Sequence, residues 1–182
     1  MLKNCRKNHF GFTLLELLVV VLIIGILAAI ALPQYKIAAA RAKFATLKDN
    51  TRILADAAER YYLIHSAYPA HYSEIDVTIS GANEVSSNND SFLIDLPNGS
   101  RCSIWFTSNP AASCYMKSLL GSKIGYYHFL VNGNNRADNR CVVYNTDSNS
   151  LANKLCQKET GKQPNQGWNK SWCNNDYCYY WY

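Results

Sequence analysis

Charged side chains are almost absent from residues 12–32. These 21 residues contain one ionisable group, Glu16, and are otherwise nearly all apolar. A helix rises about 1.5 Å per residue, so this stretch would reach roughly 30 Å, the thickness of the hydrocarbon core of a bilayer. The lack of charge argues against a water-exposed surface helix and predicts a segment that can span a membrane.

The motifs of common catalytic sites are also missing. The sequence has no H-E-x-x-H, no G-x-S-x-G and no G-x-x-x-x-G-K phosphate loop. Beyond His9 near the start of the chain, histidines are scattered at His65, His71 and His128, and we expect His65 to be packed rather than catalytic. We therefore expect no enzymatic activity and no cofactor. No metal site is assigned. Asp and Asn residues do gather at 88–90 and 134–139, and calcium binding in these loops is the alternative to a chain without a metal.

The first eleven residues differ from the apolar stretch that follows. They carry three Lys or Arg residues and no acidic residue, a bias that holds this end on the cytoplasmic side. The basic segment meets the apolar stretch at Gly11-Phe12 without a polar spacer. A carboxylate inside an apolar span costs about 2.5–3.5 kcal/mol at mid-membrane. Glu16 therefore needs a partner, unless it lies at the membrane edge and reaches the headgroups.

The run Gly11-Phe12-Thr13-Leu14-Leu15-Glu16 resembles the processing motif of type IV prepilins and of the pseudopilins of type II secretion. This resemblance covers residues 1 to about 68. It implies cleavage between Gly11 and Phe12 by a prepilin peptidase and N-methylation of Phe12. It also implies that Glu16 meets the terminal amine of a neighbouring subunit during filament assembly. The alternative is a secretory signal peptide ending at Ala29-Ile30-Ala31, but its apolar region of 19 residues exceeds the usual 7–15.

Cysteines are absent between Cys5 and Cys102. Removal of the leader would take away Cys5 and leave an even number of cysteines, all in the C-terminal part of the chain. That placement favours disulfide bonds formed outside the cytoplasm, and the lack of C-x-x-C pairs argues against zinc. Six cysteines allow 15 pairings, so the sequence leaves the pairing open, with a small Cys173–Cys178 loop as one candidate. The six are Cys102, Cys114, Cys141, Cys156, Cys173 and Cys178.

An apolar stripe continues the helix beyond the membrane-spanning segment. Its members recur mainly at steps of three and four, the spacing of one helix face. Pro33 removes a backbone donor and Gly25 weakens the helix, so we expect a kink or loosening there. The chain is therefore expected to contain a leader over 1–11, a transmembrane and polymerisation half-helix over 12–33, an amphipathic half-helix over 34–66 and a globular head over 67–182. The stripe consists of Ile37, Phe44, Leu47, Thr51, Leu54, Ala58, Tyr61 and His65.

The head is expected to be an antiparallel sheet packed on this stripe, which gives an α+β, type IV pilin-like fold with a disulfide-rich C-terminal region. A Pro-Asn-Gly turn marks the clearest hairpin. Residues 70–91 are predicted to be a connecting loop. The end of the chain, 167–182, is rich in aromatic residues, and we favour their covering one sheet edge over an exposed adhesive patch. Strands are predicted at 92–96, 102–106, 113–118, 124–131 and 141–144, and a short helix at 148–157.

Charge is distributed unevenly along the chain. Residues 34–65 hold six basic and three acidic residues, whereas 66–100 hold five acidic residues and no Lys or Arg. One interpretation is two solvated surfaces, because exposed ion pairs contribute only about 0–1 kcal/mol each. The other is that the two surfaces meet between stacked subunits, with Asp90 and Asp95 taking part.

Three functions are compatible with these features. The favoured one is a type IV pilus subunit that assembles with its own copies and other pilins, with prepilin peptidase/N-methyltransferase, the inner-membrane assembly machinery and the membrane as partners. It would lie in the inner membrane before assembly and in a surface pilus, or a periplasmic pseudopilus, afterwards. The alternatives are a type II secretion pseudopilin and a membrane-tethered binding domain that does not polymerise. Nucleic-acid contact through Lys154, Lys158, Lys162 and Lys170 is a further possibility that the pattern does not favour over a solvated face.

Overall fold

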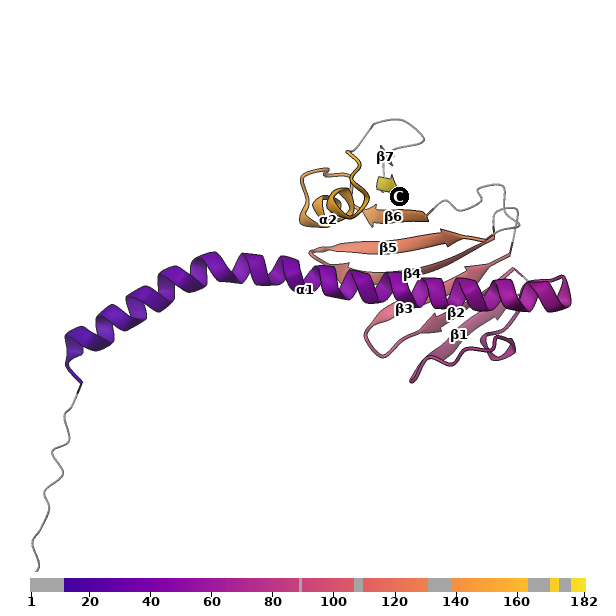
Figure 1. Cartoon of the computed structure of the whole chain (residues 1–182), viewed down its shortest axis with the longest axis horizontal. Coiled ribbons are helices and arrows are strands. Elements are labelled where there is room, and N and C mark those ends of the chain that lie inside the picture. Colours follow the sequence, from indigo (N-terminus) through magenta and orange to yellow (C-terminus); the bar gives the residue numbers. More distant parts are fainter. Residues whose placement is uncertain (1–11, 89, 107–109, 131–138, 164–170, 174–177) are drawn as a thin grey trace, which may run out of the picture. The chain divides into compact units, whose positions relative to one another are not determined.

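The computed structural model describes residues 12–88, 90–106, 110–130, 139–163, 171–173 and 178–182 (Figure 1). The chain forms two compact units, which divide between Ala39 and Ala40. One helix, α1 (Leu14–His65), supplies the first unit and the beginning of the second. It remains helical through Gly25 and Pro33, so the expected kink stays a prediction. The helix ends where Ser66 adopts a positive φ of 54° and donates its N–H to Tyr62 O at 2.8 Å.

The second unit contains an antiparallel sheet that has eight strands among the described residues. Their order across the sheet is β1-β2-β3-β4-β5-β6-β8-β7, so the first six strands are neighbours in both sequence and space. The predicted strands are all present, with ends shifted by at most two residues. The bounds are β1 (Asn83–Asn88), β2 (Ser91–Asp95), β3 (Ser100–Trp105), β4 (Ala111–Leu119), β5 (Ser122–Phe129), β6 (Asn139–Tyr144), β7 (Ser171–Cys173) and β8 (Cys178–Trp181).

The prediction of a loop over residues 70–91 is wrong. A short 3₁₀ helix, η1 (Tyr72–Glu74), and strand β1 lie in this segment. Strand β1 is an edge strand whose residues are nearly all exposed. Because it buries neither face, it lacks the alternation of apolar and polar residues by which a half-buried strand is recognised.

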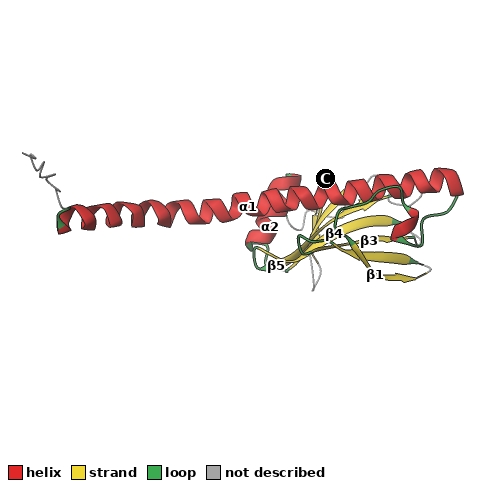
Figure 2. Ribbon diagram, turned by 90° about the horizontal axis from the view of Figure 1, so that it is seen from below, coloured by secondary structure: helices red, strands yellow, loops and turns green. Residues whose placement is uncertain are grey.

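The core of the second unit lies between α1 and one face of the sheet (Figure 2). Most of the predicted stripe is buried there, including Phe44, Leu47 and Leu54 with no exposed surface. The last turn of the helix is different, since Leu63 and Ile64 are 80% and 77% exposed. The expectation that His65 is packed is therefore wrong: the side chain is exposed and its ring stacks on Tyr61 at 4.2 Å.

Helix α2 (Leu151–Thr160) packs into the same buried cluster as α1 and therefore lies against the same face of the sheet. Cys141 on β6 and Tyr180 on β8 lie opposite each other in the sheet. Cys141 forms a disulfide with Cys156 of α2, and the Tyr180 hydroxyl donates a hydrogen bond to Asn153 of α2. Lys48 on α1 pairs with Glu159 on α2 at 2.7 Å. The helix begins later than the predicted residue 148 because Ser150 is its N-cap, and the Ser150 Oγ accepts the Asn153 N–H. The helix ends before Gly161, which adopts a left-handed φ of 69°.

Buried Asn153 ties the start of α2 to two other segments. Its side chain is fully buried, and Nδ2 donates to the carbonyl oxygens of Asn145 and Asp147, both at 2.8 Å. Its Oδ1 accepts the hydroxyl proton of Tyr180 on β8 at 2.8 Å. A single amide therefore connects the loop after β6, helix α2 and the last strand. The prediction that the C-terminal residues cover a sheet edge is confirmed in part, because they extend the sheet and Tyr180 is buried.

Two disulfides are described in full. Cys102–Cys114 joins directly opposed residues of β3 and β4, and Cys141–Cys156 joins β6 to α2. Cys178 is also disulfide-bonded, and its backbone is the register partner of Cys173 in the β7–β8 pair. The side chain of Cys173 lies outside the described atoms.

Two of the acidic residues between 66 and 100 pair with arginines of the same chain. Arg60 Nη2 lies 2.7 Å from Asp76, and Arg101 binds Asp95 through two nitrogens. The Arg101 guanidinium holds the pKa of Asp95 below its usual range. Asp95 is therefore already engaged within the chain, which weakens the hypothesis that it serves a contact between subunits.

Candidate processing and assembly site

The first unit exposes an unbroken apolar surface. Every large apolar side chain between Phe12 and Leu32 is exposed, with Leu14 at 87%. Within the described part of the chain, α1 is the one helix long and apolar enough to cross a membrane. A helix that is apolar on all sides is not stable in water and must be covered by lipid or by other protein. This surface is therefore where the chain meets a membrane or other subunits.

The beginning of α1 is closed by a capping box made of Thr13 and Glu16. Glu16 Oε2 accepts the Thr13 backbone N–H and the Thr13 hydroxyl, both at 2.8 Å. In return, Thr13 Oγ1 accepts the Glu16 N–H at 3.2 Å. These bonds satisfy donors that a helix N-terminus leaves free, and the position suits a negative charge. The Glu16 carboxylate, for which the motif implies a partner on a neighbouring subunit, thus also has a partner, Thr13, within its own chain.

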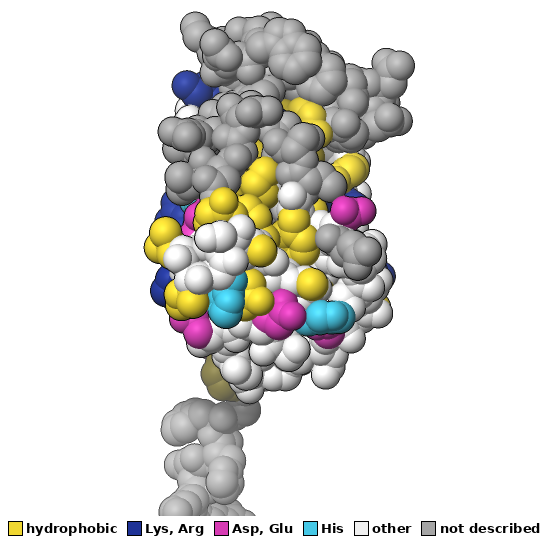
Figure 3. Space-filling view, turned by 90° about the vertical axis from the view of Figure 1, so that its right-hand side faces the viewer, with side chains coloured by type: hydrophobic (Ala, Val, Ile, Leu, Met, Phe, Trp, Pro, Cys, Tyr) yellow, Lys and Arg dark blue, Asp and Glu magenta, His cyan; other side chains and the backbone are white. Residues whose placement is uncertain are grey.

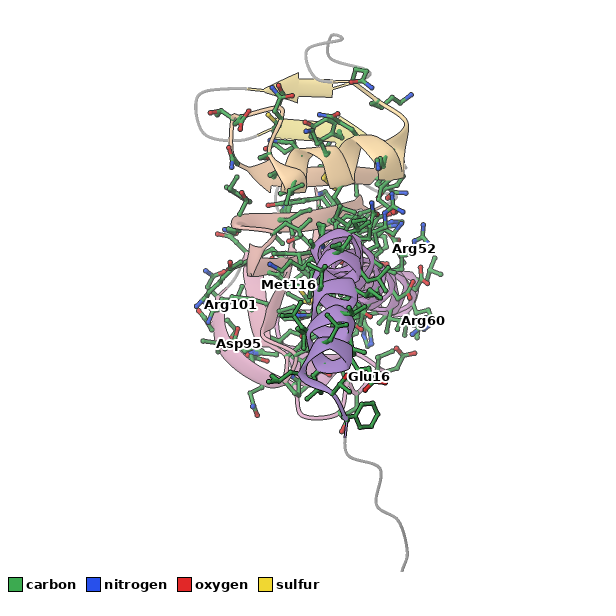
Figure 4. The ribbon with its side chains drawn as sticks, turned by 90° about the vertical axis from the view of Figure 1, so that its left-hand side faces the viewer. Glu16, Arg52, Arg60, Asp95, Arg101 and Met116 are labelled. Atoms are coloured by element: carbon green, nitrogen blue, oxygen red, sulfur yellow. A yellow bond between two sulfur atoms is a disulfide. The ribbon has the colours of Figure 1, made fainter. Side chains whose placement is uncertain are left out.

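Thr13 is the residue that sequence reasoning missed at this site. The pattern T-x-x-E just before an apolar run is a signature of a helix start, and it is visible in Thr13-Leu14-Leu15-Glu16. Of the predicted processing residues, Gly11 lies outside the described residues and Phe12 precedes the helix with its side chain 79% exposed. Figure 4 labels Glu16 on the first turn of α1.

Gly25 has open space around its Cα within the part of the chain that the structure describes. A Cβ built on Gly25 would meet no atom within 4 Å. Pro33 lies inside the helix, where it cannot donate a backbone hydrogen bond. Among the described residues, then, no side-chain packing requires a glycine at position 25.

Comparison with known proteins assigns this N-terminal region to a family. The family model described as "Prokaryotic N-terminal methylation motif" matches residues 6–32. The chain is 33% identical over 96 residues to "Type II secretion system core protein G" of Pseudomonas aeruginosa. The aligned stretch covers 50% of this chain and 68% of that protein. The chain belongs to the type IV pilin and pseudopilin family.

Pilins of Neisseria are also among the relatives of this family member. A "Fimbrial protein" of Neisseria meningitidis serogroup B is 40% identical over 70 residues, 38% of this chain and 41% of that protein. "Type IV major pilin protein PilE" of Neisseria gonorrhoeae is 39% identical over 72 residues, 40% of this chain and 43% of that protein. The chain thus matches less than half the length of these two pilins. No solved structure matches the chain.

Two surface hollows are formed by described residues of the pilin-like head. Their volumes, about 120 and 200 Å³, are smaller than the roughly 300–1,000 Å³ typical of ligand pockets. The smaller is lined by residues that include Arg60, His65 and Asp76. Figure 3 shows that histidine, acidic and apolar side chains lie together at the end of the head where α1 ends.

The described residues contain no group of three His, Cys, Asp or Glu side chains placed to hold a metal ion. Each of the two loops suggested for calcium lies partly outside those residues.

Proposed function

We propose that this chain is a structural subunit of a type IV pilus, cut between Gly11 and Phe12, methylated at Phe12 and polymerised through α1. The observation that carries the proposal is the apolar surface of residues 12–32, which one protein molecule leaves uncovered. In the membrane, lipid covers this surface. In a filament, the same surface is covered by other copies, so a subunit can leave the bilayer without exposing it to water.

Glu16 has a defined task in this scheme. Before assembly, its carboxylate is held by Thr13 at the helix start, which lowers the cost of keeping it in or near the bilayer. In the filament it would pair with the terminal amine that cleavage creates on Phe12 of a neighbour. Such a pair in a water-poor polymer core fixes the axial register, because breaking it leaves two unpaired charges. The capping box keeps the carboxylate in a single position until then.

A pseudopilin of type II secretion is the second candidate. The match to the Pseudomonas aeruginosa core protein G favours it, because that match covers a larger share of the relative than the two pilin matches do. The disulfide-rich head favours the pilus. In both cases the role is structural rather than enzymatic, and the subunit sits in the inner membrane with its head outside the cytoplasm before assembly. Its partners are the prepilin peptidase, the assembly machinery and other pilins.

The test is a non-reducing intact mass of the protein in filaments sheared from cells and in the remaining membranes. A pilus is supported if the shear fraction contains a chain that starts at methylated Phe12 and has its six remaining cysteines oxidised. The same mass confined to membranes supports a pseudopilin. A chain that retains residue 1 or begins at Leu32 contradicts both.

A further inference from the structure

Three exposed cations follow the apolar stretch of α1. They are Lys36, Arg41 and Lys43, and the sequence contains no acidic residue between Glu16 and Asp49. In the part of the chain that the structure describes, none of the three forms an ion pair or hydrogen bond with another side chain. These cations are therefore available to a ligand.

Their position runs against the usual charge bias of a membrane-spanning helix. Lys and Arg are normally in excess on the cytoplasmic side of the span. Here residues 1–11 hold three of them, and residues 34–43 on the other side also hold three. Cleavage at Gly11-Phe12 would remove the first three and leave only the outer ones. An anion at the outer membrane surface would offset this reversed bias.

The three cations lie close to the level of lipid phosphates. At about 1.5 Å per residue, Lys36 lies about 6 Å and Lys43 about 17 Å beyond Leu32 along the helix. The headgroup layer is about 5–7 Å thick. Helical side chains tilt towards the N-terminus, here towards the membrane, and attraction between charges reaches about 8 Å at physiological ionic strength. Tyr35, which is 71% exposed, is an aromatic residue of the kind enriched at this level.

The cations also project from more than one side of the helix. Lys36 and Lys43 are seven residues apart and share one side, whereas Arg41 lies about 140° around the helix axis from Lys36. A protein that lies along one side of α1 would meet only some of these charges. A membrane surface surrounds the helix and meets all of them.

The acidic segment of a second copy is a poorer partner for these cations. Four of the five acidic residues between 66 and 100 already accept hydrogen bonds within their own chain. The four are Glu74, Asp76, Glu84 and Asp95.

We propose that Lys36, Arg41 and Lys43 bind the phosphates of anionic phospholipids in the outer leaflet of the inner membrane. These lipids hold the subunit at a fixed depth until it is assembled. The inference rests on the proposed function in placing the head outside the cytoplasm. It requires neither cleavage nor polymerisation, so its failure would leave the filament proposal intact.

The test uses the full-length protein in nanodiscs of phosphatidylcholine, or of equal parts phosphatidylcholine and phosphatidylglycerol. Peptide mass spectrometry follows the acetylation rate of each lysine. Acetylation consumes the neutral amine, and an anionic surface stabilises a nearby ammonium by about 1 kcal/mol, or roughly fivefold. Lys36 and Lys43 should therefore react about fivefold more slowly beside phosphatidylglycerol. Salt at 1 M should abolish the difference, because the screening length falls to about 3 Å.

Lys154 and Lys158, exposed on α2, are internal controls and should react equally in both kinds of nanodisc. Equal slowing of these two lysines would overturn the proposal, as would unchanged rates at Lys36 and Lys43. Inorganic phosphate added to phosphatidylcholine nanodiscs separates the two sources of the anion. If it slows Lys36 and Lys43 as much as the lipid does, the site is one for free phosphate and the proposal fails.

A matched pair of variants includes Arg41 in the test. Lys36→Gln/Arg41→Gln/Lys43→Gln should lower the ratio of phosphatidylglycerol to phosphatidylcholine retained on the protein by about fivefold or more, measured by native mass spectrometry from the mixed nanodiscs. Lys154→Gln/Lys158→Gln/Lys162→Gln removes the same charge from the head and should leave that ratio unchanged. Equal losses in the two variants would overturn the proposal.

Discussion

Replacing Asn153 should destabilise the head strongly, although the residue is polar and makes its contacts through hydrogen bonds. Asn153→Ala removes three hydrogen bonds of 2.8 Å each, to Asn145 O, Asp147 O and the Tyr180 hydroxyl. At about 1 kcal/mol for each bond, the free energy of unfolding should fall by about 3 kcal/mol. For a protein of this size, that lowers Tm by roughly 6–12 °C.

The measurement is thermal unfolding of the full-length protein in detergent under non-reducing conditions. Near-ultraviolet circular dichroism is the appropriate signal, because tyrosines report on the head whereas α1 dominates the far-ultraviolet signal. Asn149→Ala, at an exposed position in the same segment, is the matched control and should change stability by less than about 0.5 kcal/mol. Asn153→Asp should be at least as harmful as Asn153→Ala, since a carboxylate would face two carbonyl oxygens. A loss below about 1 kcal/mol in Asn153→Ala would refute the reasoning.

Three further predictions concern assembly, the disulfides and pH. Glu16→Ala should leave cleavage intact but reduce sheared filaments more than about tenfold, because an unpaired buried amine costs about 3–5 kcal/mol; normal yield on an immunoblot would contradict the assembly role. Cys102→Ala/Cys114→Ala should cost about 3 kcal/mol in guanidinium unfolding, given a sequence separation of 12, and a cost near zero would be inconsistent with that estimate. Burial lowers the pKa of His128, so protonation favours the unfolded chain and stability should fall as pH drops below about 6.5. His128→Gln should remove that dependence from a series of melts between pH 7.5 and 5, and an unchanged profile would exclude His128 as its source.

Local patterns predicted the α1 stripe and the strands, because each depends on residues close together in sequence. Burial of Phe44 and Leu54 follows from helical spacing, and the turn before Ser100 follows from Pro-Asn-Gly. Strand β1 was missed because an edge strand that buries neither face has no alternation to detect. His65 continues the spacing of the stripe but lies on the exposed last turn, and spacing alone does not show where the packing ends.

The processing and assembly residues were also predicted from neighbouring residues in the sequence, but the hydrogen bonds that hold Glu16 were not predicted. Gly11-Phe12 and Glu16 were recognised from a short motif, whereas the bonds from Thr13 to Glu16 became evident only with coordinates. The disulfide pairing and the role of Asn153 depend on segments brought together by folding. An asparagine in a polar stretch gives no sign that it will be the buried junction of three elements.

The order of the strands also determines how the head can be made. From β1 to β6 each strand pairs with the one just before it, so a chain appearing from its N-terminal end can extend the sheet one strand at a time. The two disulfides described in full follow the same order. Cys102 pairs with the next cysteine, Cys114, and Cys141 pairs with the next, Cys156. An oxidase that joins cysteines in the order in which they emerge therefore makes both bonds correctly, without an isomerase to reshuffle them.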